Sequence, residues 1–157
     1  MPNFLEQLVA EWYEYQGYYI RRNVNVGKRP NGGYESELDV VALNPKKWHL
    51  IHIEPSMDCH SWSKREKRFA AKFKAGKKYI PSLFPGFVSL PEIEQMVVLV
   101  YGSNNGHSKL GGGRLVLIKE LMMDIRKELA EREVRNAAVP EQYTILRSMQ
   151  FAANFWD

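Results

Sequence analysis

The sequence has little cysteine and no long apolar run, and both absences narrow the classes of protein to which it can belong. Its single cysteine, Cys59, excludes an internal disulfide and fits a reducing, cytoplasmic compartment. No run of about 18 apolar residues occurs, so we expect no membrane-spanning helix and no membrane partner. Met1–Glu14 carries acidic residues without a basic segment, which argues against a secretory signal peptide.

What is present fits one globular domain. The 157 residues suffice for a single domain with a sizeable core, and we expect that domain to span residues 1–157. Lysine and arginine number 22 against 18 aspartates and glutamates, a formal net charge of +4. This charge is compatible with an anionic partner but does not require one.

A carboxylate stands inside an apolar stretch in the first third of the chain. Glu37–Leu43 alternates as a strand does, so Glu37 and Asp39 share one face while apolar residues fill the other positions. Burying a carboxylate in such surroundings is costly unless a cation or hydrogen bonds satisfy it. Asp39 is therefore a candidate ligand for a cation, and Glu37 either adds a ligand or caps the strand.

The next apolar stretch, Leu50–Ser56, repeats the pattern. His52, Glu54 and Ser56 share one face of the predicted strand, with Ile51 and Ile53 between them. Two carboxylates on neighbouring strands, one here and one in the preceding strand, predict a divalent metal ion held by oxygen ligands. His52 is either a further ligand or a hydrogen-bonded structural histidine.

Hydrophobic periodicity and turn residues predict a fold of class α/β (α+β in stricter usage). The first three strands are joined by short turns and form an antiparallel meander, and the glycine-rich Gly102–Gly113 is a hairpin loop or a flexible contact. The predicted order is αβββαββαα: a helix between Asn3 and Gly17, strands Tyr18–Val26, Tyr34–Leu43 and Trp48–Glu54, a helix Ser63–Lys78, strands Met96–Tyr101 and Arg114–Ile118, a helix Leu121–Glu133 and a last helix from Pro140.

The order of the carboxylates resembles that of the PD-(D/E)XK nuclease superfamily. In that superfamily a helix with a glutamate, here Glu6, precedes a hairpin that ends in an aspartate, here Asp39, and a strand that ends in Glu-x-Lys, here Glu54-Pro55-Ser56. The resemblance covers residues 4–80. It implies a restriction-endonuclease-like core, a mixed central sheet flanked by helices, and a metal-dependent DNA endonuclease. Asp39, Glu54 and the carbonyl of Pro55 are then the ligands of Mg²⁺ or Mn²⁺.

The sequence departs from this pattern at one position, because Ser56 stands where the superfamily has its lysine. Serine carries no positive charge and can only form hydrogen bonds. A lysine of the following helix is the natural substitute, and by position we expect Lys64, with Lys67 as the second candidate. Two other functions stay open: a nucleic-acid-binding domain of the same fold that cleaves poorly, and a protein-interaction module.

The helix Ser63–Lys78 is the most basic element. Lys64, Arg68 and Lys72 form one row at i, i+4 spacing, and Lys67 lies close to it. We predict that these four side chains bind a nucleic-acid backbone, the alternative being a solvated face that promotes solubility.

Three further features have two interpretations each. Glu6 either completes a capping box with Asn3 or takes part in the active site. Cys59 and His60 belong to an ordinary loop or, less simply, to a zinc site. The apolar stripe of the last helix packs on the protein's own sheet or forms a homodimer; its members are Tyr143, Leu146, Met149, Ala153 and Trp156.

Overall fold

The first helix begins at a capping box, as the sequence predicts. The computed structural model describes residues 3–156, and α1 spans Phe4–Tyr15. The side chain of Asn3 accepts a hydrogen bond from the N–H of Glu6 at 2.9 Å, and the carboxylate of Glu6 accepts from the N–H of Asn3 at 3.4 Å. Gly17 follows the helix at a φ of 97°, a conformation that favours glycine.

One mixed six-stranded sheet forms the centre of this α/β protein. The predicted antiparallel meander is confirmed, because the first three strands are antiparallel neighbours. The strand order across the sheet is β1-β2-β3-β4-β6-β5. The strands are β1 (Tyr19–Lys28), β2 (Tyr34–Asn44), β3 (His49–Ser56), β4 (Ile93–Leu99), β5 (Lys109–Leu110) and β6 (Gly113–Leu117).

The second half of the sheet corrects the prediction of a hairpin. β4 is parallel to both β3 and β6, so the glycine-rich Gly102–Gly113 does not join two antiparallel strands. Instead it contains β5, which pairs with β6 in antiparallel fashion. The predicted order αβββαββαα therefore lacks this strand. With only two residues, β5 is too short to show an alternating pattern.

The helices differ from the prediction mainly in the last third of the chain, where α3 both starts and ends three residues earlier than predicted. The predicted order also lacks the short α4. The last helix does not start at Pro140, because residues 140–143 form a turn in which the N–H of Tyr143 donates to the carbonyl of Pro140 at 3.1 Å. α3 starts before Leu121, since the carboxylate of Glu120 accepts from the N–H of Leu117 and caps the helix there. The helices after α1 are α2 (Trp62–Tyr79), α3 (Ile118–Ala130), α4 (Val134–Ala137) and α5 (Thr144–Phe155).

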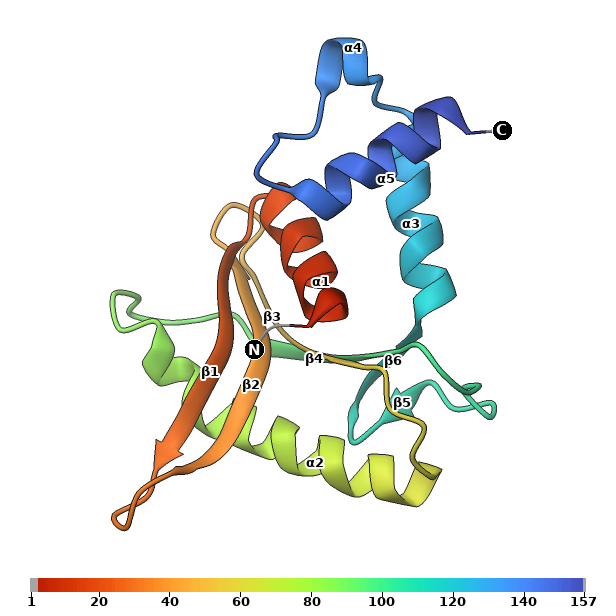
Figure 1. The fold of residues 1–157 in the computed structure, drawn as a ribbon. Coiled ribbons are helices and arrows are strands. Elements are labelled where there is room, and N and C mark those ends of the chain that lie inside the picture. Colours follow the sequence, from red (N-terminus) through yellow and green to blue (C-terminus); the bar gives the residue numbers. More distant parts are fainter. Residues whose placement is uncertain (1–2, 157) are drawn as a thin grey trace.

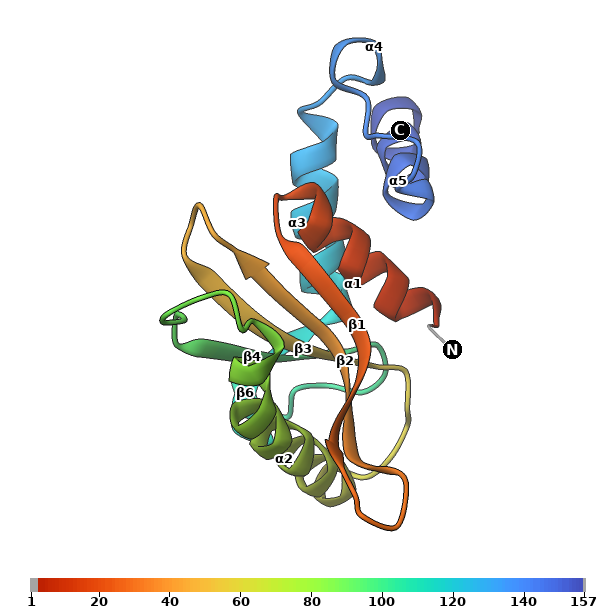
Figure 2. The same ribbon diagram turned by 90° about the vertical axis from the view of Figure 1, so that its left-hand side faces the viewer.

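Helices cover both faces of the sheet (Figures 1 and 2). α2 lies across one face, where Phe69 and Phe73 are buried, and α1, α3 and α5 lie on the other. The stripe of α5 joins the core above the sheet by packing on α1 and α3, with Leu146 buried and Trp156 78% exposed. Within residues 3–156 no helix is long and apolar enough to cross a membrane.

The turn between β5 and β6 fixes how closely α2 approaches the sheet. A Cβ atom at Gly111 would lie 2.6 Å from the backbone nitrogen of Ala70 in α2, and Gly111 has a φ of 60°. Its neighbour Gly112 has a φ of 87° and open space around it.

We predict that Gly111→Ala destabilises the protein more than Gly112→Ala. Both alanines would stand at a positive φ, but only the first also overlaps α2, which adds roughly 1–3 kcal/mol. Urea denaturation of the two variants measures this difference. Equal losses in both variants would show that α2 does not rest on this turn.

Candidate active site

Asp39 and Glu54 lie where β2 and β3 stop pairing. The last pair of the ladder between these strands is Val40 with Ile53, so the next residue of each strand is one of the two carboxylates. The N–H of Asp39 donates a hydrogen bond to Oε1 of Glu54 at 3.2 Å. The two predicted ligands are therefore neighbours at the point where the sheet opens, and both are buried.

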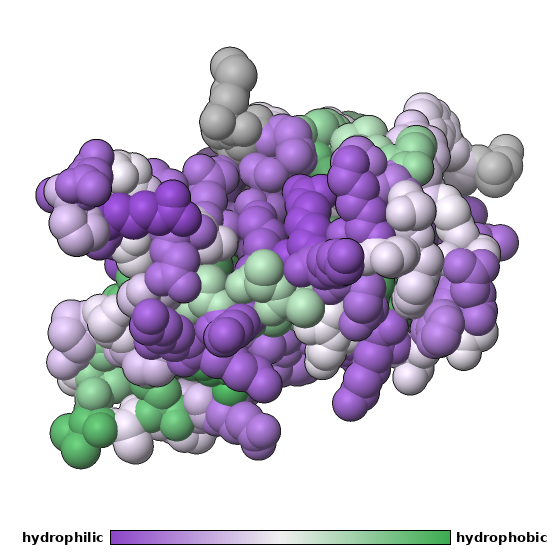
Figure 3. All heavy atoms as spheres, turned by 90° about the horizontal axis from the view of Figure 1, so that it is seen from below, coloured by the Kyte–Doolittle hydropathy of each residue, from purple (hydrophilic) through white to green (hydrophobic). Residues whose placement is uncertain are grey.

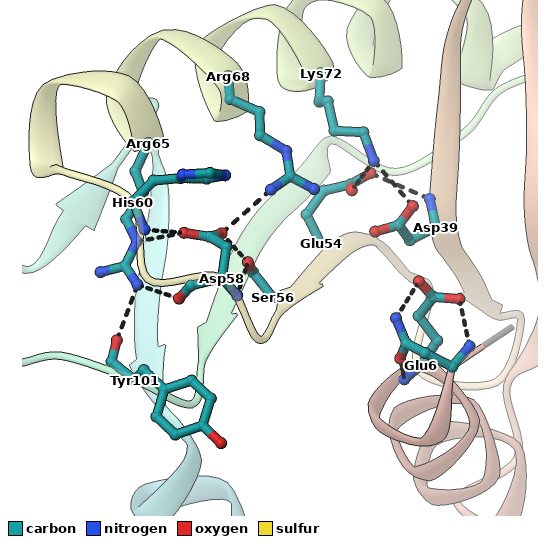
Figure 4. A network of polar contacts seen from close by, with 11 residues as sticks. Glu6, Asp39, Glu54, Ser56, Asp58, His60, Arg65, Arg68, Lys72 and Tyr101 are labelled. Atoms are coloured by element: carbon teal, nitrogen blue, oxygen red, sulfur yellow. Dashed lines mark hydrogen bonds and ion pairs between the residues drawn. The ribbon is translucent and has the colours of Figure 1, made fainter.

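A lysine from α2 bridges the two carboxylates. Nζ of Lys72 lies 2.9 Å from Oδ1 of Asp39 and 2.5 Å from Oε2 of Glu54 (Figure 4). Its side chain is only 17% exposed. The three side chains thus form a compact, largely buried ion cluster with two negative charges and one positive charge when all are ionised.

Lys72, and not Lys64, is the lysine that reaches the carboxylates. We predicted Lys64 or Lys67 for this place and Lys72 for nucleic-acid binding, but Lys64 and Lys67 are exposed, and neither forms an ion pair within the described residues. Lys64 sits near the start of α2, about 12 Å along the helix axis from Lys72. α2 runs about two helical turns across the sheet from Lys64 before it reaches the carboxylates. Sequence spacing alone does not reveal this distance.

The pKa values in the cluster are shifted in opposite directions. Burial, and then the charge of Glu54, raise the pKa of Asp39 to about 8. Burial also opposes ionisation of Glu54, but the hydrogen bond from His52 and the charge of Lys72 outweigh it and lower the pKa of Glu54. The carboxylates likewise outweigh burial at Lys72 and raise its pKa. The structure therefore favours an ionised Glu54 and a charged Lys72, with Asp39 as the group that exchanges a proton near neutral pH.

Glu6 approaches the cluster from the opposite face but does not join it. Its carboxylate accepts hydrogen bonds from Nδ2 of Asn3 at 2.9 Å and from Nδ2 of Asn23 at 3.3 Å. Figure 4 shows it at the start of α1, beyond Asp39. The capping interpretation has direct contacts in the structure, whereas a part for Glu6 in the active site stays a prediction.

Ser56 belongs to a second polar cluster at the end of β3. Its hydroxyl donates a hydrogen bond to the carboxylate of Asp58, which also pairs with Nε of Arg65 at 3.0 Å and with Nη1 of Arg68 at 3.2 Å. Burial raises the pKa of Asp58, but the bonds from Ser56, His60 and Arg65 outweigh it and bring the value to about 2. Ser56 thus holds a loop in place and does not stand in for the missing lysine.

Arg65 ties two loops together, and Arg68 stays accessible. The guanidinium of Arg65 is buried and donates to the carbonyls of Asp58 at 2.6 Å and Tyr101 at 3.1 Å, joining the loop after β3 to the loop after β4. Arg68 is 44% exposed and lies between Asp58 and Glu54 in Figure 4. Asp58 therefore holds the guanidinium of Arg68 in place on the exposed side of α2.

The outer face of α2 is basic, as predicted. Lys64, Lys67 and Arg68 are exposed on it, whereas Lys72 turns into the site. The side of the molecule that α2 covers is predominantly hydrophilic (Figure 3).

The remaining candidates lie as follows. His52 is fully buried, and its Nε2 is 2.7 Å from Oε1 of Glu54, so it contacts the cluster through Glu54. Glu37 is exposed. Cys59 is exposed with a free thiol, and no three histidine, cysteine, aspartate or glutamate side chains within residues 3–156 converge as a metal site does. This finding gives the zinc interpretation of Cys59 and His60 no support.

The oxygen atoms at the site nevertheless fit a hard divalent cation. Oδ1 of Asp39 and Oε2 of Glu54 already converge on one cationic atom, Nζ of Lys72. Carboxylate oxygens and a backbone carbonyl, which Pro55 could supply, are the donors that Mg²⁺ and Mn²⁺ prefer. Two protein carboxylates suffice for Mg²⁺, which keeps several water ligands.

No protein-family model, curated protein sequence or solved structure matches this chain.

Two signals in the sequence pointed to features of the site that our prediction missed. Gly76 stands inside α2, and a glycine within a helix indicates a close approach of another group. Lys72 lies one turn before it and next to the buried Phe73, which places it at the border of the buried face. The cluster of Asp58 and Arg65 had no comparable signal, because an Asp–Arg pair seven positions apart occurs in many exposed segments.

We predict that Asp39→Asn stabilises the metal-free protein increasingly as pH rises. The pKa of Asp39 is higher in the folded chain (about 8) than in the unfolded one, so its contribution is complete at low pH and is lost as pH rises through 8. In the presence of a chelator, the gain in thermal midpoint over the wild type should be larger at pH 9 than at pH 5 by about 3 °C or more.

The matched control is Glu37→Gln, which removes an exposed carboxylate from the same strand. Its difference from the wild type should vary little with pH. An Asp39→Asn difference that is equally flat would show that Asp39 ionises as a solvent-exposed aspartate does.

Proposed function

We propose that this protein is a metal-dependent DNA endonuclease of the PD-(D/E)XK type, with a restriction-endonuclease-like core. The observation that carries the proposal is the bridge from Lys72 to both Asp39 and Glu54. Ser56 leaves the position of the motif lysine without a positive charge, and α2 supplies an ammonium group at the carboxylates from another part of the chain. The site then holds all three charged groups of the motif.

The carboxylates would hold the metal ion and Lys72 would serve the attacking water. Asp39 and Glu54, with the carbonyl of Pro55, would bind Mg²⁺ or Mn²⁺, which lowers the pKa of a bound water and stabilises charge on the phosphate. The ammonium of Lys72 would hold this water by a hydrogen bond and stabilise the negative charge that develops as the water oxygen bonds to phosphorus. The phosphorus–oxygen bond to the leaving nucleotide would break in the same reaction. The proton of the attacking water would pass to solvent, and the leaving oxygen would take its proton from solvent.

Exposed cations on α2 would bind the DNA backbone. The helix that carries Lys72 also exposes Lys64, Lys67 and Arg68. A nucleic-acid backbone that runs along α2 would therefore also pass the carboxylates. Arg68 would be one of these contacts, with its guanidinium held by the carboxylate of Asp58.

The second candidate function is nucleic-acid binding with little cleavage. The observation that favours it is Ser56, which bonds Asp58 rather than the carboxylates of the site. A protein-interaction module, the third interpretation of the sequence, explains neither the buried ion cluster nor the exposed basic row. A homodimer remains a prediction that would rest on the exposed Trp156 and its neighbours.

We predict that Lys72→Met strongly reduces the rate of cleavage and that Lys64→Met does not. Loss of a group that positions and polarises the water should lower kcat by roughly 10²–10⁴-fold, whereas Lys64→Met removes one backbone contact and should only weaken DNA binding at higher salt. Cleavage of linear and branched DNA with Mn²⁺ measures both. Equal activity of Lys72→Met and the wild type would overturn the assignment of Lys72.

Metal binding gives a prediction of opposite sign for the same variant. The ammonium of Lys72 and a divalent cation compete for Oδ1 of Asp39 and Oε2 of Glu54, so Lys72→Met should bind Mn²⁺ more tightly than the wild type while it cleaves less. Calorimetry with Asp39→Ala as the non-binding control measures this. Absence of Mn²⁺ binding to the wild type, with DNA binding intact, would favour the second candidate function.

A further inference from the structure

A chain of hydrogen bonds runs behind Glu54 and connects it to the helix that carries Lys72. The backbone carbonyl of Phe73, the residue after Lys72, accepts from Nε2 of Gln95 at 2.8 Å. Nε2 of Gln95 also lies 3.3 Å from Nδ1 of His52, whose Nε2 is 2.7 Å from Oε1 of Glu54. The chain therefore crosses from α2 through β4 to β3, the strand with the carboxylate.

The chemistry of the partners fixes where each proton lies. A carbonyl only accepts, so the atom of Gln95 beside the carbonyl of Phe73 must be its amide nitrogen. That nitrogen donates its second hydrogen to Nδ1 of His52, which must therefore accept. The proton of the imidazole then lies on Nε2 and is donated to Glu54.

This arrangement leaves one oxygen of Glu54 for the site. Oε1 accepts from Nε2 of His52 and from the N–H of Asp39, while Oε2 faces Lys72. A carboxylate with one oxygen held by two donors cannot rotate without losing both hydrogen bonds. Glu54 is thus held with Oε2 toward the ammonium.

The space for the imidazole is also built into α2. His52 is fully buried and its ring lies perpendicular to that of Phe73, with ring centroids 5.2 Å apart and an interplanar angle of 90°. A Cβ atom at Gly76, one helical turn after Lys72, would overlap Nδ1 of His52. Glycine inside a helix costs about 1 kcal/mol relative to alanine, and here its absent side chain admits the histidine.

We propose that His52, held in one tautomer by Gln95, is a positioning residue that fixes Oε2 of Glu54 toward the metal ion and Lys72. The inference rests on the proposed function, because it assigns a role in the same site. His52 does not itself touch the metal ion or the DNA; it acts through Glu54. Partners of this kind, which orient a metal-binding carboxylate, typically change metal affinity or activity by roughly 10–100-fold when they are removed.

The experiment compares three variants with the wild type. His52→Gln keeps a donor near the position of Nε2 and an acceptor for Gln95, His52→Leu removes both, and Gln95→Leu removes the group that fixes the tautomer. His49→Gln, at the other end of β3, is the control for changing a histidine on this strand. Each protein is measured for thermal midpoint, Mn²⁺ affinity by calorimetry, and kcat and KM for DNA cleavage. Nitrogen NMR of the wild type reads the tautomer of His52 directly.

We expect the wild type to show the proton of His52 on Nε2. His52→Leu should bind Mn²⁺ roughly 10–100-fold more weakly and lose kcat while KM for DNA stays unchanged. His52→Gln should recover most of both losses, and Gln95→Leu should fall between the two. His49→Gln should match the wild type in Mn²⁺ affinity and kcat.

Four results would overturn the inference. A proton on Nδ1 of His52 contradicts the hydrogen-bond chain, whatever the protein does with DNA. His52 would be a structural residue only if His52→Leu matched the wild type in Mn²⁺ affinity and kcat. The same would hold if His52→Leu and His52→Gln showed equal losses of affinity and kcat that follow their losses of thermal midpoint. Absence of both Mn²⁺ binding and cleavage in the wild type would overturn the proposed function and this inference together, which separates that case from the others.

Discussion

The contact between Lys72 and the carboxylates of Asp39 and Glu54 is the interaction on which the rest of the site depends. Glu54 has no solvent exposure, and a buried carboxylate is tolerated only when charge and hydrogen bonds compensate for lost hydration. Lys72 gives the charge, and His52 and the N–H of Asp39 give the hydrogen bonds. The cluster lies where the ladder between β2 and β3 ends, and α2 carries its lysine to that point.

The close approach of α2 to the sheet is what lets a helical lysine take part. Three glycines permit it: Gly76 makes room for His52, Gly111 for the backbone of α2, and Gly113 for the ring of Phe73. One helix thus buries an aromatic face, extends a lysine into the site and presents basic side chains to solvent. In the proposed nuclease these three tasks bring the DNA backbone, the water and the carboxylates to the same helix.

Much of the fold could be predicted from the sequence, because it depends on local patterns. The capping box of Asn3 and Glu6, the meander of the first three strands and the neighbouring positions of Asp39 and Glu54 follow from spacing and alternation. The parallel pairing of β4 with β6 could not be predicted in this way, because periodicity gives no strand direction. β5 was missed because its two residues show no periodicity. The start of α5 at Thr144 was also missed, because a proline suited to a first helical turn serves equally well in a turn.

The sequence by itself determined which residues can carry charge into the sheet and that Ser56 cannot do so. Only the tertiary structure decided that Lys72 rather than Lys64 reaches Asp39 and Glu54. Both lysines lie in the same basic helix, and the helix period places them nearly on one row. The angle and depth at which α2 crosses the sheet select one of them, and these are set by packing between segments far apart in the chain, which local spacing does not encode.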